Sequence, residues 1–375
     1  MSSKNIYIIY RSMFDQNGKQ TGLGGIENYI TALATTFKEQ GWNCTLVQPS
    51  KQSFTVQKDT LTIAGIETGL LRGNLKKYAL ANWVKKHANK DQDVVIFATD
   101  SYSVNLKGYN VVAIQHGVSW DKPRKTKSKA ASFLASLTNQ IKYFSFIKSS
   151  HTLVCVDHNF VNWYRTWADV QPNKVKVIYN FFDEKITTEA FEQKWQANDE
   201  RSTNIIIARR FVEYRGIKLI IPVIQKLLAK HQNLKVTFAG NGPLQQDLKN
   251  AFKSSPNVSI EQYEANESFK YHSAHHIAVI PTLGSEGTSL SMIEAMAAGC
   301  TVVTSNVGGL SNIIVGEYNG LSVIPDETQF FNALDRLIID KELNRELALA
   351  GLQSISKPCS KAHWSKQWVE LIKEF

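Results

Sequence analysis

The chain has 375 residues, a formal net charge of +10, and a composition that is 43% hydrophobic and 20% charged. This length is typical of two domains, and the composition excludes a disordered or low-complexity protein. No apolar run approaches the roughly 20 residues that a membrane-spanning helix needs, so we expect no membrane span.

The first half of the chain alternates short β-branched runs with helical patterns. The first run, NIYIIY, has one lysine before it and no small-residue cleavage site after it, which predicts a strand rather than a signal peptide. We therefore expect a cytoplasmic protein, and the absence of a CxxC pair among its four cysteines agrees with a reducing compartment. Strands are predicted at 5–10, 43–48, 61–66, 93–100, 110–117, 151–157 and 174–180, with helices near 25–40, 73–89, 128–148 and 159–167.

A break in this rhythm separates the two halves. Residues 186–203 are polar and lack periodicity, which predicts a linker or an exposed connection. A second series follows, with strands predicted at 204–210, 234–240, 257–263, 277–282, 301–306 and 320–325 and helices near 217–231, 243–253, 267–274 and 289–298. The fold class is therefore α/β, with two Rossmann-like, doubly wound domains facing each other across a cleft. We place them at 1–180 and 181–375, with a last helix at about 360–375 that packs back on the N-terminal domain through a stripe of Trp364, Trp368, Leu371 and Ile372.

The stretch GSEGTSLSMIEAMAAG, residues 284–299, combines a small-residue helix with two glutamates, Glu286 and Glu294. A carboxylate that faces a packed interior is costly unless it is paired. The preceding strand puts Glu286 in a loop and the amides of Thr288, Ser289 and Leu290 at a helix start, where free N–H groups favour anionic oxygen. Glu294, further along that helix, could accept two hydrogen bonds from a vicinal diol such as ribose.

This stretch resembles the signature of the retaining nucleotide-sugar glycosyltransferases of the GT-B fold, family 4 (glycosyl transferases group 1). The E-x7-E spacing alone is weak, but further matching segments follow in the same order along nearly the whole chain. They are GLGGIENY at 22–29, QHG at 115–117, VIYNFFD at 177–183, ARRFVEYRG at 208–216, FAGNGPL at 238–244 and GCTVVTSNVGGLSNII at 299–314.

The resemblance implies a role for each matching residue around a donor sugar nucleotide. Glu294 would hold the ribose hydroxyls, and Glu286 and His116 would be catalytic residues at the donor sugar. Because the family usually has Lys where Arg215 stands, the leaving-group contacts are expected to differ in detail. The diphosphate would be bound by Arg210, Arg215, the amides of Thr288, Ser289 and Leu290, and the backbone of Gly24 and Gly25.

The resemblance also implies the reaction and its partners. A sugar would move from a nucleotide diphosphate sugar to a glycan or lipid-linked glycan, as in cell-surface polysaccharide or glycoconjugate synthesis, with retention of anomeric configuration. A UDP-sugar is favoured over a GDP-sugar, and neither a cofactor nor a metal is expected. Asp91-Gln92-Asp93 precedes its strand instead of following it, and adjacent His275 and His276 point to opposite faces, so neither predicts a metal site.

The excess of positive over negative charge lies entirely in the first half, where residues 1–180 hold 23 Lys and Arg against 11 Asp and Glu. Within it, residues 121–150 combine basic and apolar side chains. One interpretation is a core-facing helix with a solvated basic loop; the other is a surface for anionic lipid at the inner face of the membrane. No nucleic-acid module appears in this half, so we expect no nucleic-acid partner.

Alternatives remain at this point. The same fold could belong to a non-catalytic partner subunit, a sugar-nucleotide epimerase or a phosphorylase. Intact Glu286, Glu294, Arg210 and Arg215 argue against the first, and a phosphorylase would need a pyridoxal lysine or phosphate site for which the sequence offers no candidate.

Overall fold

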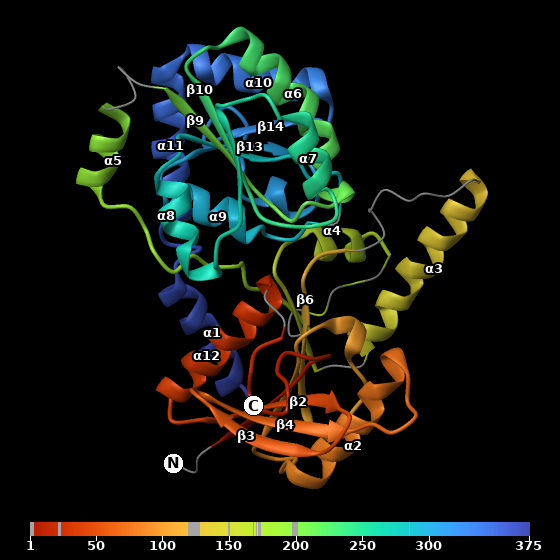
Figure 1. The fold of residues 1–375 in the computed structure, drawn as a ribbon. Helices are drawn as coiled ribbons and strands as arrows, with labels where there is room; N and C mark the ends of the chain where they lie inside the picture. The colour runs from red at the N-terminus through yellow and green to blue at the C-terminus, as the bar shows by residue number, and fades with distance from the viewer. Residues whose placement is uncertain are drawn as a thin grey trace. The chain divides into compact units, whose positions relative to one another are not determined.

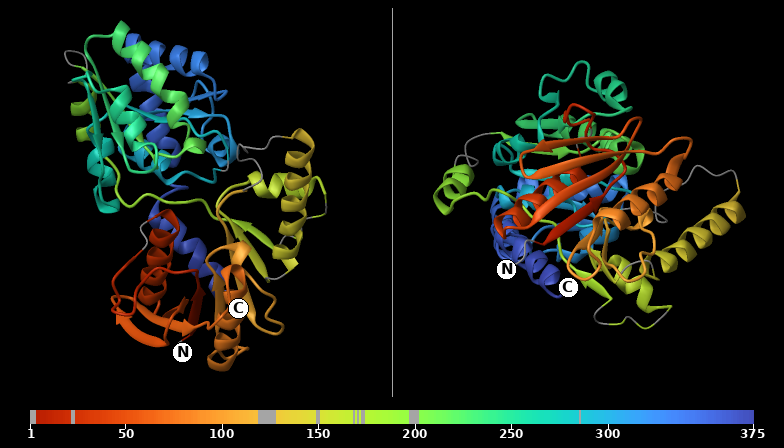
Figure 2. Two further views of the ribbon diagram at one scale, coloured as in Figure 1. Left: turned by 45° about the vertical axis from the view of Figure 1, so that its right-hand side comes forward. Right: turned by 90° about the horizontal axis from the view of Figure 1, so that it is seen from below.

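The computed structural model of the protein describes residues 4–21, 24–118, 128–148, 151–167, 169, 171, 174–196, 202–284 and 286–375. These residues form two compact units (Figures 1 and 2). The first contains the described residues of Met1–His116, Thr126–Ile178 and Trp364–Phe375, and the second those of Gly117–Lys125 and Tyr179–His363.

The first unit is built on an eight-stranded sheet with the order β3-β4-β2-β1-β5-β6-β7-β8. Neighbouring strands run parallel except β3 and β4, which are antiparallel. Its strands are β1 (Asn5–Ile9), β2 (Asn43–Ser50), β3 (Phe54–Lys58), β4 (Leu61–Glu67), β5 (Val94–Phe97), β6 (Asn110–Gln115), β7 (Thr152–Cys155) and β8 (Val175–Val177). Its helices are α1 (Gly25–Glu39), α2 (Lys76–His87), α3 (Lys129–Lys148) and α4 (Asn159–Arg165), with short 3-10 turns η1 (Gly73–Leu75) and η2 (Asp100–Tyr102).

The last helix, α12 (Lys361–Lys373), contributes its residues from Trp364 onward to the first unit. The predicted stripe of Trp364, Trp368, Leu371 and Ile372 is buried. The ring centroids of Trp364 and Tyr29 of α1 lie 5.0 Å apart, and Trp368 Nε1 donates to the Tyr29 hydroxyl at 2.8 Å. Burial of these aromatic rings, together with the Trp368–Tyr29 hydrogen bond, fixes this helix on α1.

The second unit has a six-stranded, wholly parallel sheet with the order β11-β10-β9-β12-β13-β14. Alternate residues of β9 face two separate cores, with Ile205 and Ile207 in one and Ile206 and Ala208 in the other. Both faces are therefore covered, as a parallel sheet requires. The strands are β9 (Thr203–Ala208), β10 (Leu234–Ala239), β11 (Val258–Glu261), β12 (Ile277–Ile280), β13 (Thr301–Ser305) and β14 (Leu321–Val323).

Helices α6 to α11 cover this second sheet, and 3-10 turns mark three of its loops. The helices are α6 (Ile217–Lys230), α7 (Gln245–Ala251), α8 (Ser268–Ser273), α9 (Leu290–Ala297), α10 (Glu327–Ile339) and α11 (Lys341–Ile355). The turns are η3 (Glu213–Arg215), η4 (Ala265–Glu267) and η5 (Gly308–Asn312). The α/β class with two parallel-sheet, doubly wound domains is confirmed. None of the described helices is long and apolar enough to cross a bilayer.

The prediction of a linker or exposed connection at 186–203 is wrong for Thr188–Gln196. Residues 197–201 of this range lie outside the described residues. Thr188–Gln196 forms helix α5, whose Phe191 and Trp195 are buried against Ala348 and Leu352 of α11. Two apolar residues four apart make one short stripe, too short for periodicity to reveal, and tertiary packing stabilises the helix. Strand β3 and helices α10 and α11 were also not predicted from the sequence.

Candidate active site

The loop between β12 and α9 lies at the carboxyl end of the second sheet. Ser289 is the N-cap of α9 and has an extended backbone, so the helix begins at Leu290. Ser291 Oγ donates to the carbonyl of Ala208 at 2.9 Å, which ties the first turn of α9 to the end of β9. Because the first amides of a helix have no partner within it, this end of α9 presents N–H groups at the sheet edge.

Glu286 is buried in this loop, and its carboxylate binds two arginines. Its Oε2 accepts from Nη2 of Arg209 and Nη1 of Arg215, and from the hydroxyl of Thr282 at 2.9 Å. Burial raises the pKa of Glu286, but the charges of Arg209 and Arg215 outweigh burial and hold that pKa below its usual value. The cluster of one carboxylate and two guanidinium groups therefore keeps one net positive charge.

Arg209 is the functional candidate that sequence reasoning missed. Besides Glu286, it binds the hydroxyls of Ser289 at 2.9 Å and Thr282 at 2.6 Å, and its side chain is only 6% exposed. Arg210, which the resemblance assigned to the diphosphate, is exposed and donates to the Tyr214 hydroxyl at 3.0 Å. The sequence feature that could have indicated Arg209 is the Arg-Arg pair directly after a strand. Neighbouring side chains there point in different directions, so either arginine could be the one that faces the site.

Two glycines let the backbone approach closely around Glu286. Gly216 follows Arg215 with φ of 78°, and a Cβ there would lie 1.7 Å from the Pro281 carbonyl. Gly308 has φ of 55°, and a Cβ there would lie 2.3 Å from the Glu286 carbonyl, which accepts the amide of Gly309 at 2.9 Å. Only glycine fits both positions, so these turns fix the backbone on each side of the arginine–glutamate cluster.

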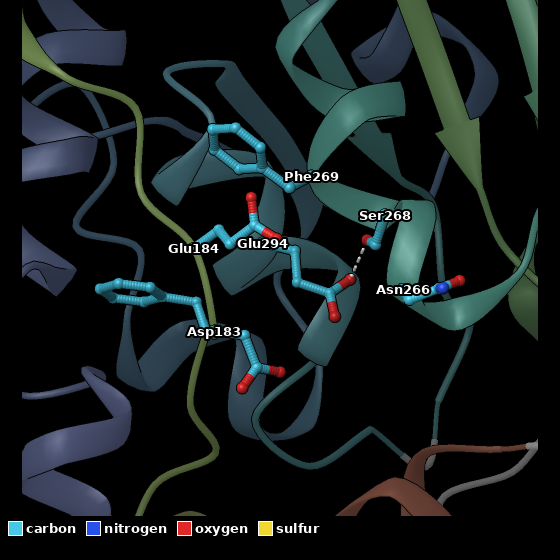
Figure 3. Close-up of a pocket in the computed structure, with 7 residues that line it drawn as sticks. Asp183, Glu184, Asn266, Ser268, Phe269 and Glu294 are labelled. Carbon is cyan, nitrogen blue, oxygen red and sulfur yellow. Dashed lines mark hydrogen bonds between the residues drawn. The ribbon is translucent and has the colours of Figure 1, made fainter.

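Glu294 lines a pocket of about 180 Å³ in the second unit, shown in Figure 3. Its Oε2 accepts the hydroxyl of Ser268 at 2.6 Å. Burial raises the pKa of Glu294, the Ser268 hydrogen bond opposes this effect, and the nearby Asp183 charge adds to it. The pocket is lined by Phe182, Asp183, Glu184, Asn266, Ser268, Phe269 and Glu294.

This lining has three carboxylates and no basic side chain, so it suits hydrogen-bond donors such as sugar hydroxyls and disfavours phosphate. Glu294 and Ser289 are five residues apart, or roughly 7.5 Å along a helix. The carboxylate-lined pocket and the cationic cluster are therefore arranged along one helix, and the pocket volume suits part of a ligand rather than a whole one.

The backbone of Thr288 is held by Asn180. Asn180 Nδ2 donates to the Thr288 carbonyl, and the Asn180 side chain is buried. Asn180 belongs to the VIYNFFD segment that sequence analysis matched to the family without assigning this residue a role. Thr288, Ser289 and Leu290 thus lie together with Glu286, Glu294 and Arg215 in the second unit.

His116, Gly24 and Gly25 lie in the first unit. His116 follows β6, and its Nε2 lies 2.9 Å from the Ala98 carbonyl. A carbonyl only accepts, so Nε2 carries the proton and Nδ1 is left as an acceptor in the neutral ring. Burial lowers the pKa of His116 to about 4, against the opposing effect of the Ala98 hydrogen bond. Gly24 is the extended N-cap of α1, and Gly25 is its first residue.

The residues that resemble metal motifs have structural partners instead. Asp93 accepts the backbone amides of Asn5 at 3.1 Å and Asn89 at 2.8 Å. His275 forms hydrogen bonds through Nδ1 with the Tyr271 carbonyl and through Nε2 with the Thr237 hydroxyl. His276 Nδ1 accepts the amide of Asn204 at 3.1 Å. Among the residues that the structure describes, no group of three or more His, Cys, Asp or Glu side chains could hold a metal ion.

Two family models match this chain and together span most of it. The model described as glycosyl transferases group 1 matches residues 202–340, and that described as glycosyltransferase family 4 matches residues 23–185. The chain belongs to the GT-B glycosyltransferases of family 4, group 1.

Curated relatives match shorter segments. An uncharacterized glycosyltransferase of Methanocaldococcus jannaschii is 32% identical over 45% of this chain and 46% of its own length. The gpi3 subunit of phosphatidylinositol N-acetylglucosaminyltransferase of Schizosaccharomyces pombe is 24% identical over 54% of this chain and 44% of its own length. N-acetyl-α-D-glucosaminyl L-malate synthase of Bacillus anthracis is 25% identical over 59% and 58%. The chain therefore spans about half the length of the relatives that it matches.

Solved structures share the fold over nearly the full chain. Sucrose-phosphate synthase of Thermosynechococcus elongatus has a TM-score of 0.78 at 16% identity, covering 99% of this chain and 98% of that one. Anabaena HepE, solved in complex with UDP, has a TM-score of 0.72 at 15% identity, covering 99% and 100%. At these identities the likeness establishes the GT-B fold of this family member and no substrate.

Proposed function

We propose that the protein is a retaining, metal-independent glycosyltransferase that moves a sugar from a nucleotide diphosphate sugar, preferably a UDP-sugar, to a glycan or lipid-linked glycan. The observation that carries this proposal is the arrangement along α9: a cationic cluster at its N-terminus and a carboxylate-lined pocket beside Glu294. In a sugar nucleotide the diphosphate lies between two hydroxyl-bearing rings, so a diphosphate at the cationic cluster would have a hydroxyl-bearing ring on the side of the Glu294 pocket.

Each group then has a role that its chemistry permits. Glu294, with Ser268 beside it, would accept the ribose hydroxyls, and Arg215 and the α9 amides would stabilise the diphosphate. All three recorded donors to Glu286 meet Oε2, so we expect a donor-sugar hydroxyl to meet Oε1. His116 would accept a further sugar hydroxyl at Nδ1.

The proposed reaction needs no protein nucleophile. The bond between the anomeric carbon and the phosphate oxygen breaks while the acceptor oxygen bonds to the same face of that carbon. The acceptor proton passes to the departing diphosphate, whose developing charge is stabilised by the cationic cluster. Arg215, now held by Glu286, would exchange part of that ion pair for the diphosphate.

Donor binding is the first test. Isothermal titration calorimetry with UDP and GDP should show tighter binding of UDP, and Glu294→Ala should weaken it at least about tenfold, because a charged hydrogen bond to ribose is lost. The exposed Glu346 on α11 gives the matched control, Glu346→Ala, which should leave the affinity unchanged. Absence of affinity for any nucleotide or nucleotide sugar would contradict the proposal.

Product analysis tests the chemistry. A panel of nucleotide sugars and glycan acceptors should yield a glycoside whose anomeric configuration, read by NMR, matches that of the donor. Activity should persist with EDTA. An inverted product or an activity abolished by EDTA would refute retention or metal independence, while conversion of the donor to an epimer without acceptor would identify an epimerase.

A further inference from the structure

His272 is a fully buried histidine of α8 that has no role in the proposed reaction. Burial lowers its pKa to about 4, against the hydrogen bond with the Ser268 backbone, so the ring is neutral at neutral pH. Helix α8 packs on α9, and Cys300 Sγ, just after α9, donates to the His272 carbonyl at 3.1 Å. The ring is therefore fixed beside the helix that carries Glu294.

The contacts of the His272 ring show which nitrogen carries the proton. Nδ1 lies 2.8 Å from the carbonyl of Ser268, which can only accept, so Nδ1 is the donor. The Ser268 hydroxyl oxygen lies 3.3 Å from the same nitrogen and shares this proton. Nε2 is then an acceptor, and it is buried without a hydrogen-bond partner among the residues that the structure describes.

The unpaired Nε2 indicates what the histidine contributes at this position. A buried acceptor without a partner costs free energy, and an apolar side chain of similar size, such as leucine, would avoid that cost. Packing alone therefore favours a residue other than histidine. What the ring adds to this part of the fold is the Nδ1–H group that it directs at Ser268.

Ser268 transmits this contact to Glu294. Its hydroxyl has one proton, and Nδ1 of His272 already carries a proton of its own, so the hydroxyl donates to Glu294 Oε2 at 2.6 Å. Figure 3 shows this hydrogen bond, with the second carboxylate oxygen of Glu294 directed away from Ser268. One oxygen of Glu294 is thus bound within the protein, and the other is left for a ligand in the pocket.

Tyr263 is a further neighbour of Ser268, and it is uncharged. Burial and the Glu294 charge raise the pKa of Tyr263 to about 12, against a hydrogen bond with the Ser268 side chain. The Tyr263 ring stacks on that of Tyr271 in α8, with the centroids 4.7 Å apart. Both side-chain neighbours of Ser268 besides Glu294 are therefore neutral, so the carboxylate is the strongest acceptor for its proton.

We propose that His272 is a positioning residue of the donor site, which acts through Ser268 to fix the Glu294 carboxylate in the orientation that receives the ribose hydroxyls. The inference rests on the proposed function, in which Glu294 binds ribose, and it adds the group that holds Glu294 in place. A carboxylate that is already oriented loses less conformational freedom when the ligand binds, so the ligand binds more tightly.

The test is isothermal titration calorimetry on the full chain with UDP and with 2′,3′-dideoxyuridine diphosphate, which lacks the ribose hydroxyls. His272→Leu removes the Nδ1 donor, His272→Asn keeps an amide donor near its position, and Ser268→Ala removes the hydroxyl. The matched control is His275→Leu on the same helix. His275 Nδ1 makes the same kind of contact, 2.7 Å from the carbonyl four residues before it, but its partners are Tyr271 and Thr237.

We expect His272→Leu to weaken UDP binding about tenfold, while His272→Asn and His275→Leu stay within about twofold of the wild type. Because His272 acts through Ser268, His272→Leu should add little to the loss already caused by Ser268→Ala. The dideoxy ligand should bind the wild type and His272→Leu equally, since it has no hydroxyl for Glu294 to receive.

Three results would overturn the proposal: equal losses in His272→Leu and His275→Leu, an equal loss for both ligands, or additive losses in the double variant. Each would show that His272 supports the fold in general. Circular dichroism checks the folding of every variant. If His272→Leu does not fold, His272→Gln, which moves the amide donor to the Nε2 position, takes its place in the comparison.

The same titrations separate this inference from the proposed function. If the wild type binds UDP and Glu294→Ala weakens the binding while His272→Leu does not, the positioning role alone is refuted. If the wild type binds neither UDP nor any nucleotide sugar, the proposed function is refuted and the positioning role with it.

Discussion

The carboxyl edges of the two sheets differ in the charged groups that they bury. In the second unit, Arg209 and Arg215 are buried as charges because Glu286 pairs with both. In the first unit, half-buried His116 and buried Asp100 have no ion-pair partner among the described residues, and desolvation lowers the pKa of His116 to about 4 and raises that of Asp100 to about 7. One edge is preorganised for an anionic ligand, and the other favours uncharged groups.

The difference follows from the cost of burying charge. A guanidinium removed from water needs a carboxylate and further hydrogen bonds, which the second unit supplies through Thr282 and Ser289. Asp100 Oδ1 accepts the amide of Ser101 at 2.7 Å, and its buried Oδ2 has no hydrogen-bond partner among the residues that the structure describes. A neutral edge of this kind suits hydroxyl groups better than ions.

Replacing Arg209 should have the largest effect, because it removes one of the two buried arginines of the second unit. Arg209→Met leaves Glu286 with Arg215 as its one ionic partner and should reduce the free energy of unfolding by about 3–5 kcal/mol. Its neighbour gives the control, because Arg210→Met at an exposed position should change it by less than about 0.5 kcal/mol. Urea unfolding measures the free energy of unfolding of both variants. Equal decreases would contradict the distinction between a buried Arg209 and an exposed Arg210. UDP affinity in Arg210→Met also tests the sequence-based assignment of Arg210 to the diphosphate.

Glu286→Gln should separate catalysis from donor binding. Removing the carboxylate charge leaves the arginine pair less neutralised, so UDP should bind at least as tightly, while turnover should fall about 100-fold as the contact with the donor sugar weakens. Steady-state kinetics and calorimetry give the two values. The exposed Glu342→Gln on α11 should alter neither. A weakened UDP affinity with normal turnover would show that Glu286 serves the diphosphate side only.

His116→Ala should lower turnover about tenfold, the effect of one lost hydrogen bond. Because the His116 pKa is about 4, the wild-type ring is neutral above about pH 5 and should add no pH dependence there. Below that pH, protonation converts Nδ1 from acceptor to donor, so the wild-type rate should fall while the variant rate does not. The exposed His158→Ala is the control. A wild-type inflection near pH 6.5 that His116→Ala removes would contradict a buried neutral ring.

Asp100→Asn should have the smallest effect, on the pH dependence of stability. The folded-state pKa of Asp100 is raised, so between about pH 4 and 7 the folded protein keeps a proton that the unfolded chain has lost, and stability falls as pH rises. Asp100→Asn should make the free energy of unfolding less dependent on pH and raise it by about 1–2 kcal/mol at pH 8. Burial, Asp157 and Asp100 all raise the pKa of the Cys155 thiol, so Cys155 is a neighbouring titratable group. Thermal unfolding across this pH range measures the slope, and an unchanged slope, with the exposed Asp91→Asn as reference, would refute the assignment.

The sequence by itself determined the two βα series, the family and the position of the α9 stretch. Strand alternation and helix stripes such as Trp364 and Trp368 are local patterns, so they can be read without coordinates. Glu286 and Glu294 could likewise be singled out because a carboxylate in a small-residue helix start has few structural explanations.

Only the tertiary structure decided which polar groups meet. The sequence does not distinguish the roles of the adjacent Arg209 and Arg210. The loop geometry after β9 buries Arg209 beside Glu286 and leaves Arg210 exposed. Ser268 binds Glu294, which is 26 residues away in the chain, and Asn180 binds Thr288, which is 108 residues away. Helix α5 exists because α11 buries its two aromatic residues. Such pairings depend on chain segments brought together in space, and local sequence patterns contain no information on that.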